Sequence, residues 1–140
     1  MNARAMLETT TITQAVTIPA KPVQVYDALI NPLKHAAFTG AKATGNGVEG
    51  GAFSAWDGYI TGTYVKLQRA RQILAEWKTS EWPAGYPASQ LMLSFQDSDA
   101  GTLVTMVHSE VPVSQAEAYN RGWTDYYWTP LKEYFSASHS

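Results

Sequence analysis

The hydrophobic pattern of the chain changes period near its start. From Thr10 to Ile18 most apolar residues fall at every second position, which is typical of a strand, and a proline ends the run. From Pro22 to Ile30 the apolar residues share one helical face instead. Pro32 then begins a second short helix that extends to about Thr39. The pattern therefore predicts one strand followed by two short helices.

Strands and turns fill the middle of the chain. The dipeptide Asp57-Gly58 suits the positive φ angles of a type I′ turn, so the residues on either side are predicted to pair as a hairpin. Its register puts Trp56 and Tyr59 on one face, which we expect to point outward. The opposite face, predicted to be core, carries Phe53, Ala55, Ile60 and Tyr64.

Three later strands are predicted to continue the apolar face. The segment from Arg71 to Thr79 alternates so that Trp77 points inward. The segments Ser89 to Gln96 and Thr102 to Val111 then flank a turn that we read as a four-residue loop. With that loop the facing pairs are Leu91 with His108, Leu93 with Met106, and Phe95 with Val104. Because both strands then agree on an apolar face, the register is internally consistent.

The last element, Ser114 to Phe135, has helical periodicity. Ser114 and Glu117 have the spacing of a capping box, and Pro130 predicts a bend. The helical stripe consists of Tyr119, Trp123, Tyr126, Tyr127, Leu131 and Tyr134. The order of elements predicts an α+β fold with a long helix on one face of a curved antiparallel sheet. We expect a single domain over residues 1–140, with an ordered core of about 9–136 and loose ends outside it.

Composition narrows the class of protein. The chain has 140 residues, and 45% of them are hydrophobic, which suits one globular domain. The absence of cysteine excludes disulfides, thiol chemistry and cysteine-ligated zinc. A net charge of -2 disfavours binding to nucleic acid or to an acidic membrane surface. No signal peptide or apolar span is recognisable, so we expect a cytoplasmic protein.

Candidate chemistry is sparse. The three histidines, His35, His108 and His139, are far apart in sequence, so no metal site is predicted. No cofactor motif is supported either, because the glycine-rich Gly45 to Gly50 segment precedes a strand rather than a helix. His108 shares the core face, where it is either a half-buried, hydrogen-bonded histidine or one that contacts a ligand or handles protons. No catalytic residue is assigned, since no carboxylate pair has an acid–base spacing.

A second candidate surface lies on the hairpin strands. Basic side chains that include Arg69 and Lys78 lie in the two strands that follow Trp56 and Tyr59. Such a run is usually a solvated strand edge that discourages further strand pairing. Beside two outward aromatic residues it would instead form a protein-docking face, since Trp, Tyr and Arg are favoured anchors of interfaces.

The motifs along the chain together resemble a known family. They are Ile18-Pro-Ala-x-Pro-x-x-Val-Tyr-x-Ala-Leu, Glu49-Gly-Gly-x-Phe, Trp56-Asp-Gly-Tyr-Ile-x-Gly, Ile73-x-x-x-Trp77 with Trp82-Pro83, Gly101-Thr-x-Val-Thr-x-x-His108 and Gly122-Trp-x-x-Tyr-Tyr-x-x-Pro-Leu-Lys-x-Tyr134. In order and spacing they resemble the family of the activator of the heat-shock protein 90 ATPase, within the START-like (birch-pollen-allergen-like, SRPBCC) superfamily. This resemblance implies a helix-grip fold, in which a seven-stranded antiparallel sheet wraps round a long C-terminal helix and leaves a cavity between them.

Three functions compete at this point. The first is a non-enzymatic domain whose cavity binds a small hydrophobic or aromatic molecule. The predicted lining is Phe53, Tyr64, Trp77, Leu93, Met106, His108, Trp123, Tyr127 and Leu131. The second, from the resemblance, is docking on a heat-shock protein 90-type chaperone through Trp56, Tyr59, Arg69 and Lys78. The third is an enzyme of the polyketide cyclase type, with His108 as general acid or base and a tyrosine such as Tyr64 or Tyr127 orienting the substrate.

Overall fold

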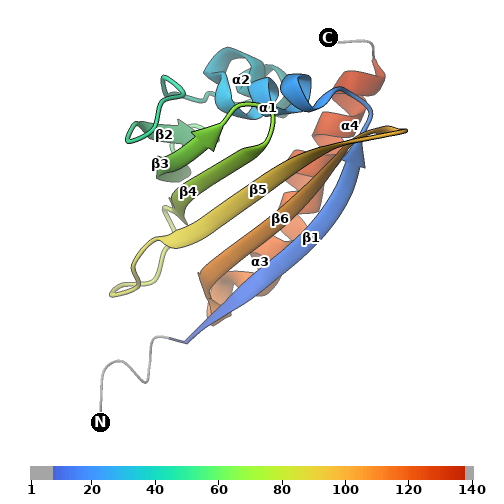
Figure 1. Cartoon of the computed structure of the whole chain (residues 1–140). Coiled ribbons are helices and arrows are strands. Elements are labelled where there is room, and N and C mark those ends of the chain that lie inside the picture. Colours follow the sequence, from blue (N-terminus) through green and yellow to red (C-terminus); the bar gives the residue numbers. More distant parts are fainter. Residues whose placement is uncertain (1–7, 138–140) are drawn as a thin grey trace.

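A curved antiparallel sheet packs against one long C-terminal helix (Figure 1). The computed structural model describes residues 8–137; His139 and most of the two predicted loose ends lie outside the described residues. The strands are β1 (Thr9–Ile18), β2 (Ala52–Ala55), β3 (Ile60–Gln68), β4 (Gln72–Thr79), β5 (Ser89–Ser98) and β6 (Gly101–Pro112). The helical elements are α1 (Pro22–Ile30), α2 (Pro32–Thr39), α3 (Val113–Trp123), η2 (Thr124–Trp128) and α4 (Thr129–Ser136).

The sheet has one strand fewer than the family resemblance implies. Within residues 8–137 six strands pair in the order β1-β6-β5-β4-β3-β2. Beyond β2, Thr44 and Ser54 exchange two backbone hydrogen bonds of 3.0 and 3.1 Å, and Asp57 donates one more to the carbonyl oxygen of Lys42 at 3.0 Å. Gly45 and Gly47 have φ angles of 138° and 66°, which turn the chain away from the sheet. The seventh strand is therefore reduced to a single bridge.

The predicted strand register is confirmed. Ala55 lies opposite Ile60, and the pairs Leu91–His108, Leu93–Met106 and Phe95–Val104 are all present. The hairpin turn differs from the prediction, because it contains the four residues 56–59 rather than two. Trp56 and Asp57 both have positive φ angles, 53° and 57°, so the backbone leaves the extended conformation one residue earlier than the type I′ turn requires.

The two short helices begin and end where the sequence predicts. Asn31 separates them, and its side-chain Oδ1 accepts hydrogen bonds from the backbone N–H groups of Leu33 and Lys34 at 2.9 and 3.2 Å. These bonds satisfy two of the free donors at the start of α2. Gly40, in the left-handed conformation at φ 79°, ends that helix. Both helices are held against the rest of the chain by buried side chains, Val25 and Tyr26 among them.

The C-terminal helix is interrupted by a π-helical segment just before Pro130. This proline has no N–H group, and in a regular helix its ring would collide with the carbonyl of Tyr126. The wider turns of η2, Thr124–Trp128, absorb the mismatch, so the predicted irregularity lies on the N-terminal side of the proline. The predicted capping box is wrong, because the helix begins at Val113 after Pro112 without a side-chain cap.

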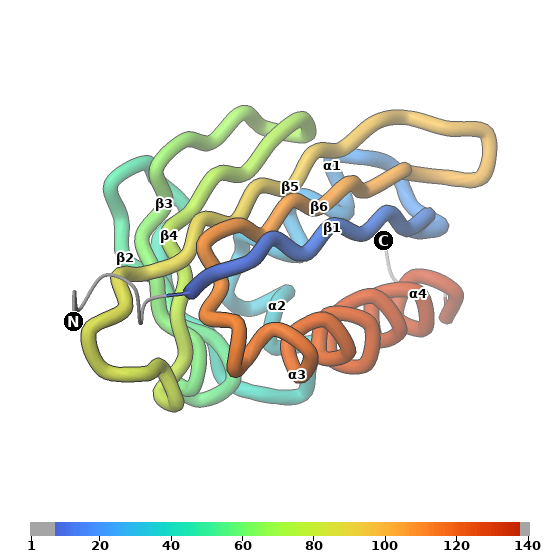
Figure 2. Tube along the Cα trace, turned by 90° about the horizontal axis from the view of Figure 1, so that it is seen from below, coloured from blue at the N-terminus to red at the C-terminus, as the bar shows by residue number. Residues whose placement is uncertain are grey.

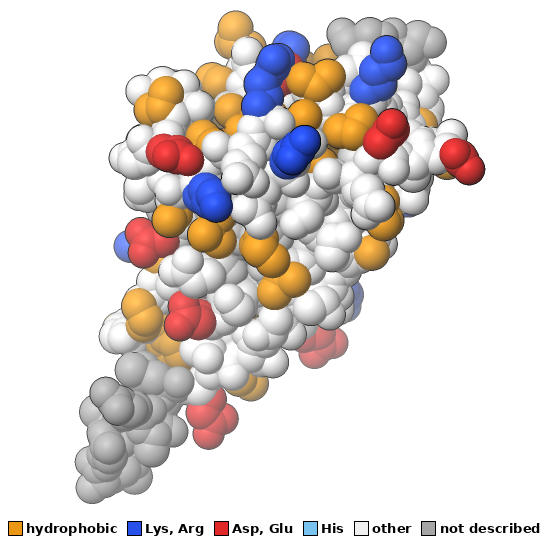
Figure 3. Space-filling model, in the orientation of Figure 1, with side chains coloured by type: hydrophobic (Ala, Val, Ile, Leu, Met, Phe, Trp, Pro, Cys, Tyr) orange, Lys and Arg blue, Asp and Glu red, His pale blue; other side chains and the backbone are white. Residues whose placement is uncertain are grey.

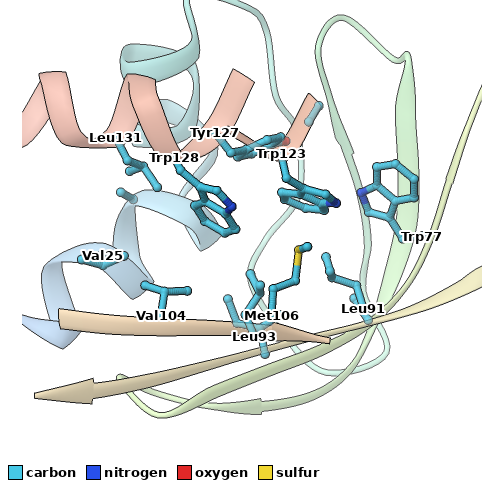
Figure 4. Packing of buried hydrophobic residues seen from close by; sticks show 14 of the residues in the cluster. Val25, Trp77, Leu91, Leu93, Val104, Met106, Trp123, Tyr127, Trp128 and Leu131 are labelled. Carbon is cyan, nitrogen blue, oxygen red and sulfur yellow. The ribbon is translucent and has the colours of Figure 1, made fainter. Parts of the chain in front are cut away.

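The core lies between the concave face of the sheet and this helix, which runs beneath β1 and β6 (Figure 2). Trp123 and Trp128 stack with ring centroids 5.5 Å apart, above Met106 and Val104 of β6 (Figure 4). Gln14 of β1 links the sheet to the helix by hydrogen bonds. Its Oε1 accepts a 2.7 Å hydrogen bond from the indole N–H of Trp128, and its amide donates to the backbone oxygen of Asn120.

Candidate functional site

The interior space between sheet and helix is small. It measures about 50 Å³, against about 300 Å³ for the smallest ordinary ligand sites. A volume of 50 Å³ holds one or two water molecules. Of the nine residues predicted to line a cavity, six line this space: Phe53, Tyr64, Trp77, Leu93, Trp123 and Tyr127. Met106, His108 and Leu131 are fully buried and do not line it. The large aromatic side chains therefore fill most of the predicted cavity.

A larger, open groove lies on the surface beside the C-terminal helix. Its volume is about 630 Å³, and it runs between the β2–β3 turn, the residues after β4 and the exposed flank of the C-terminal helix. Its walls are Trp56, Tyr59, Ile60, Trp77, Glu81, Gln115, Ala118, Tyr119, Arg121, Gly122, Trp123, Asp125, Tyr126 and Tyr127. Seven of these fourteen residues are aromatic. The predicted cavity residues Trp77, Trp123 and Tyr127 separate this groove from the interior space, since they line both.

The expectation that Trp56 and Tyr59 face outward is wrong. Both side chains are partly buried against the core and line the groove. The ring of Trp56 meets the ring of Tyr126 on the helix edge to face, with centroids 5.5 Å apart. The hydroxyl of Tyr59 donates a 2.6 Å hydrogen bond to Glu81. Because the turn begins at Trp56 with a positive φ, strand alternation no longer determines where its side chain points.

The four predicted docking residues do not form one surface. Arg69 follows the far end of β3, about 30 Å along the strand from Tyr59, and is ion-paired with Asp27 at 3.0 Å. Lys78 is exposed on β4, where it pairs across the sheet with Thr61. In Figure 3 the Lys and Arg side chains lie mostly in the upper part of the face, separated by other side chains. Trp56 and Tyr59 therefore belong with the groove and not with these basic side chains.

His108 is buried completely and every polar atom of its ring has a partner. The indole N–H of Trp123 donates to its Nδ1 at 3.1 Å. Because an indole can only donate, Nδ1 must be unprotonated and the proton lies on Nε2. Nε2 is 2.8 Å from the hydroxyl of Ser89, which itself donates to the carbonyl oxygen of Trp77 at 2.7 Å. The four groups form one chain of hydrogen bonds that joins the helix to β6, β5 and β4.

This geometry favours a structural role for His108 over proton transfer. Burial lowers the pKa of the imidazole to about 3, so it stays neutral at physiological pH. A proton on Nδ1 would also break the bond from Trp123. His108 is more deeply buried than the sequence prediction of a half-buried side chain, and it lines neither the groove nor the interior space.

A second buried histidine was not singled out by the sequence analysis. Nε2 of His35 lies 3.1 Å from the hydroxyl of Tyr127, while Nδ1 has no hydrogen-bond partner among residues 8–137. Burial lowers the pKa of His35 to about 4 and raises the pKa of the Tyr127 hydroxyl. The signal was present in the sequence, since His35 lies three residues before Phe38 on the buried face of α2.

Within residues 8–137 no group of three His, Asp or Glu side chains is arranged to hold a metal ion. None of the helices over the same range is both long and apolar enough to cross a membrane.

A curved antiparallel sheet that grips one long helix defines the helix-grip class of fold. The chain belongs to the family described as activator of Hsp90 ATPase homolog 1-like protein, whose sequence model matches residues 19–136. The human activator of 90 kDa heat shock protein ATPase homolog 1 is 30% identical over 129 residues, 92% of this chain and 38% of its own length. The chain thus spans between 25% and 39% of the length of the curated relatives it matches.

Solved structures share the fold at lower identity. An HSP90 activator from Plasmodium falciparum superposes with a TM-score of 0.78 at 20% identity, covering 91% of this chain and 96% of that one. DynU16, from the dynemicin biosynthetic locus, gives a TM-score of 0.76 at 17% identity, covering 91% and 48%. At these identities the likeness concerns the fold alone.

Proposed function

We propose that this chain is a non-enzymatic, cytoplasmic binding domain that takes a small hydrophobic or aromatic molecule. The binding site is the open groove, and the observation that carries the proposal is its size together with its lining. A volume of about 630 Å³ falls in the ordinary range of ligand sites, and half of the lining residues are aromatic. The interior space of about 50 Å³ is too small for this role.

The groove has a buried floor and one exposed wall. Trp77 and Trp123 are 4% exposed and packed into the core, so their rings are already held in place. Tyr126 on the opposite wall is 58% exposed and contacts Trp56. A flat molecule in the groove would cover Tyr126 and Trp56 at once. Burial of aromatic surface against rigid rings is favourable because little side-chain freedom is lost on binding.

Replacement of Tyr126 by serine should therefore weaken ligand binding without unfolding the protein. The neutral dye N-phenyl-1-naphthylamine, which fluoresces more strongly in apolar sites, serves as the probe. We expect Tyr126→Ser to raise its dissociation constant by about 5- to 10-fold, because one ring contact is worth about 1 kcal/mol. Leu33→Ser is the matched control, since Leu33 is 82% exposed and lies outside the groove.

The two variants separate site-specific binding from general surface adsorption. An equal loss in Tyr126→Ser and Leu33→Ser, or no saturable binding to the unmodified protein, would remove the groove as the ligand site. Thermal unfolding of each variant checks that the fold is intact. Because both residues are exposed, we expect little change in the melting temperature.

A second candidate function is association with a heat-shock protein 90-type chaperone. The family membership and the relatives named as activators of that ATPase support it. The four predicted docking residues, Trp56, Tyr59, Arg69 and Lys78, do not form one contiguous surface. A chaperone would therefore have to bind a different surface. Addition of the purified chain to a bacterial chaperone of this class tests the idea. If the chaperone shows neither binding nor a change in ATP turnover, the idea fails.

A further inference from the structure

The charges of the groove point to the chemical class of its ligand. We propose that the molecule bound there carries a positively charged organic group, such as a quaternary ammonium, seated against the aromatic rings beside Glu81. This inference rests on the proposed function and adds to it the charge of the ligand. It follows from three observations: the fixed position of Glu81, the balance of charge in the lining, and the electrostatics of the ring faces.

Glu81 is held in place at the rim of the groove. Its Oε1 accepts the 2.6 Å hydrogen bond from the hydroxyl of Tyr59, and its backbone N–H donates to the hydroxyl of Thr79 at 3.3 Å. Thr79 in turn shares a 2.6 Å hydrogen bond with Tyr119 on the helix. The carboxylate is therefore held by Tyr59, and the backbone of the same residue is linked through Thr79 to the helix, so little ordering is needed on binding.

The lining of the groove carries an excess of negative charge. It contains two carboxylates, Glu81 and Asp125, and one guanidinium, Arg121. None of the three has an ion-pair partner among residues 8–137. Arg121 and Asp125 lie four residues apart on the C-terminal helix, so their fields partly offset each other. Glu81, which follows β4 on the other side of the groove, is left unbalanced.

The field of Glu81 reaches the groove rings. Burial is the main cause of two raised pKa values: that of Tyr59, which rises to about 12, and that of Tyr119. The negative charge of Glu81 adds to both shifts. The same field that disfavours a tyrosinate would favour a cation. Faces of Trp and Tyr rings are electronegative and attract ammonium groups, most strongly where water is displaced. Trp56, Tyr59, Tyr119 and Tyr126 supply such rings to the lining of the same groove.

A matched pair of ligands tests the inference. In 3-hydroxyphenyltrimethylammonium a quaternary nitrogen stands where 3-tert-butylphenol has carbon, so the two differ in charge and hardly in shape. We expect calorimetric titration to give about tenfold tighter binding for the cation, as desolvated cation–aromatic contacts imply. Glu81→Gln should reduce this preference to about threefold or less while retaining an oxygen that accepts from Tyr59. Glu76→Gln, on an exposed site of β4 outside the groove, should leave the preference unchanged.

The outcomes distinguish this inference from the proposed function. Equal affinity for the two compounds would overturn the cation preference and leave hydrophobic binding in the groove intact. Tightest binding of the anion 3-hydroxybenzenesulfonate would overturn it as well. A preference that survives in Glu81→Gln would show that the carboxylate does not recognise the charge. If neither phenol binds, the cation inference and the proposed function fail together.

Discussion

Replacement of Trp77 by alanine should lower the free energy of unfolding by about 3–5 kcal/mol, the usual cost of removing a large buried aromatic side chain. Trp77 is 4% exposed. Its ring lies edge to face against His108 and Tyr119, with centroids 4.7 and 5.2 Å away, and it packs on Trp123 at 5.9 Å. The substitution would empty the place where the sheet, the helix and the groove floor meet.

Urea unfolding of Trp77→Ala and of a matched surface variant gives the measurement. Val65→Ala on the neighbouring strand removes an apolar side chain that is 48% exposed, and it should cost well under 1 kcal/mol. A loss below about 1 kcal/mol in Trp77→Ala would mean that this side chain is not part of the core. Because the free energy comes from the midpoint and the slope together, an unchanged slope confirms that the two variants unfold in the same way.

Acidification should destabilise the protein well above the pH at which carboxylates titrate. Burial lowers the pKa of His108 to about 3 and that of His35 to about 4, from an ordinary value of 6.5. Below pH 6.5 the unfolded chain binds a proton at each histidine and the folded chain does not. The free energy of unfolding therefore falls as the pH falls, by about 1.4 kcal/mol per pH unit for each histidine. From pH 7 upward the histidines are neutral in both states, and the protein keeps this part of its stability in full.

Urea unfolding between pH 7 and pH 5 measures this slope, since aspartate and glutamate stay largely ionised in the unfolded chain over that range. Near pH 5 we expect the free energy to fall by about 2.5 kcal/mol per pH unit. His35→Gln, which cannot titrate, should remove about half of the slope. A free energy that stays flat from pH 6.5 to pH 5 would contradict the burial of two neutral histidines.

Strand register was predictable because it depends on alternation and on loop length. The pairs Leu91–His108 and Leu93–Met106 follow from two apolar strands that agree with each other across one short turn. Helix bounds were predictable where proline and glycine mark them, as at Pro32 and Gly40. These signals are local, so one sequence is enough to find them.

The groove was not predictable, because it depends on where a turn directs its side chains. Strand alternation placed Trp56 outside, whereas its positive φ turns the ring toward Tyr126 of the distant helix. The size of the interior space could not be predicted from the sequence either. Periodicity shows that Trp123 faces inward, but only packing shows that its ring lies against Trp77 of β4 and leaves about 50 Å³. Both features depend on contacts between residues far apart in the chain.

The same limit applies to the chemistry of the histidines. Strand parity places His108 on the core face, yet its neutral state follows from burial, and its tautomer follows from its ring partners Trp123 and Ser89. No sequence spacing links these groups. A candidate general acid or base thus becomes a buried connection between the helix and three strands once its hydrogen bonds are known.

The indole N–H signals of the tryptophans test the central claim, that a small hydrophobic molecule binds in the groove and not in the core. Each of the five tryptophans gives one such signal in a ¹H–¹⁵N spectrum. Titration with neutral 3-tert-butylphenol should shift the signal of Trp56 saturably, because its ring lines the groove. The signal of Trp128, which is bonded to Gln14 away from the groove, should stay in place. A shift of Trp128 with Trp56 unchanged would contradict the account.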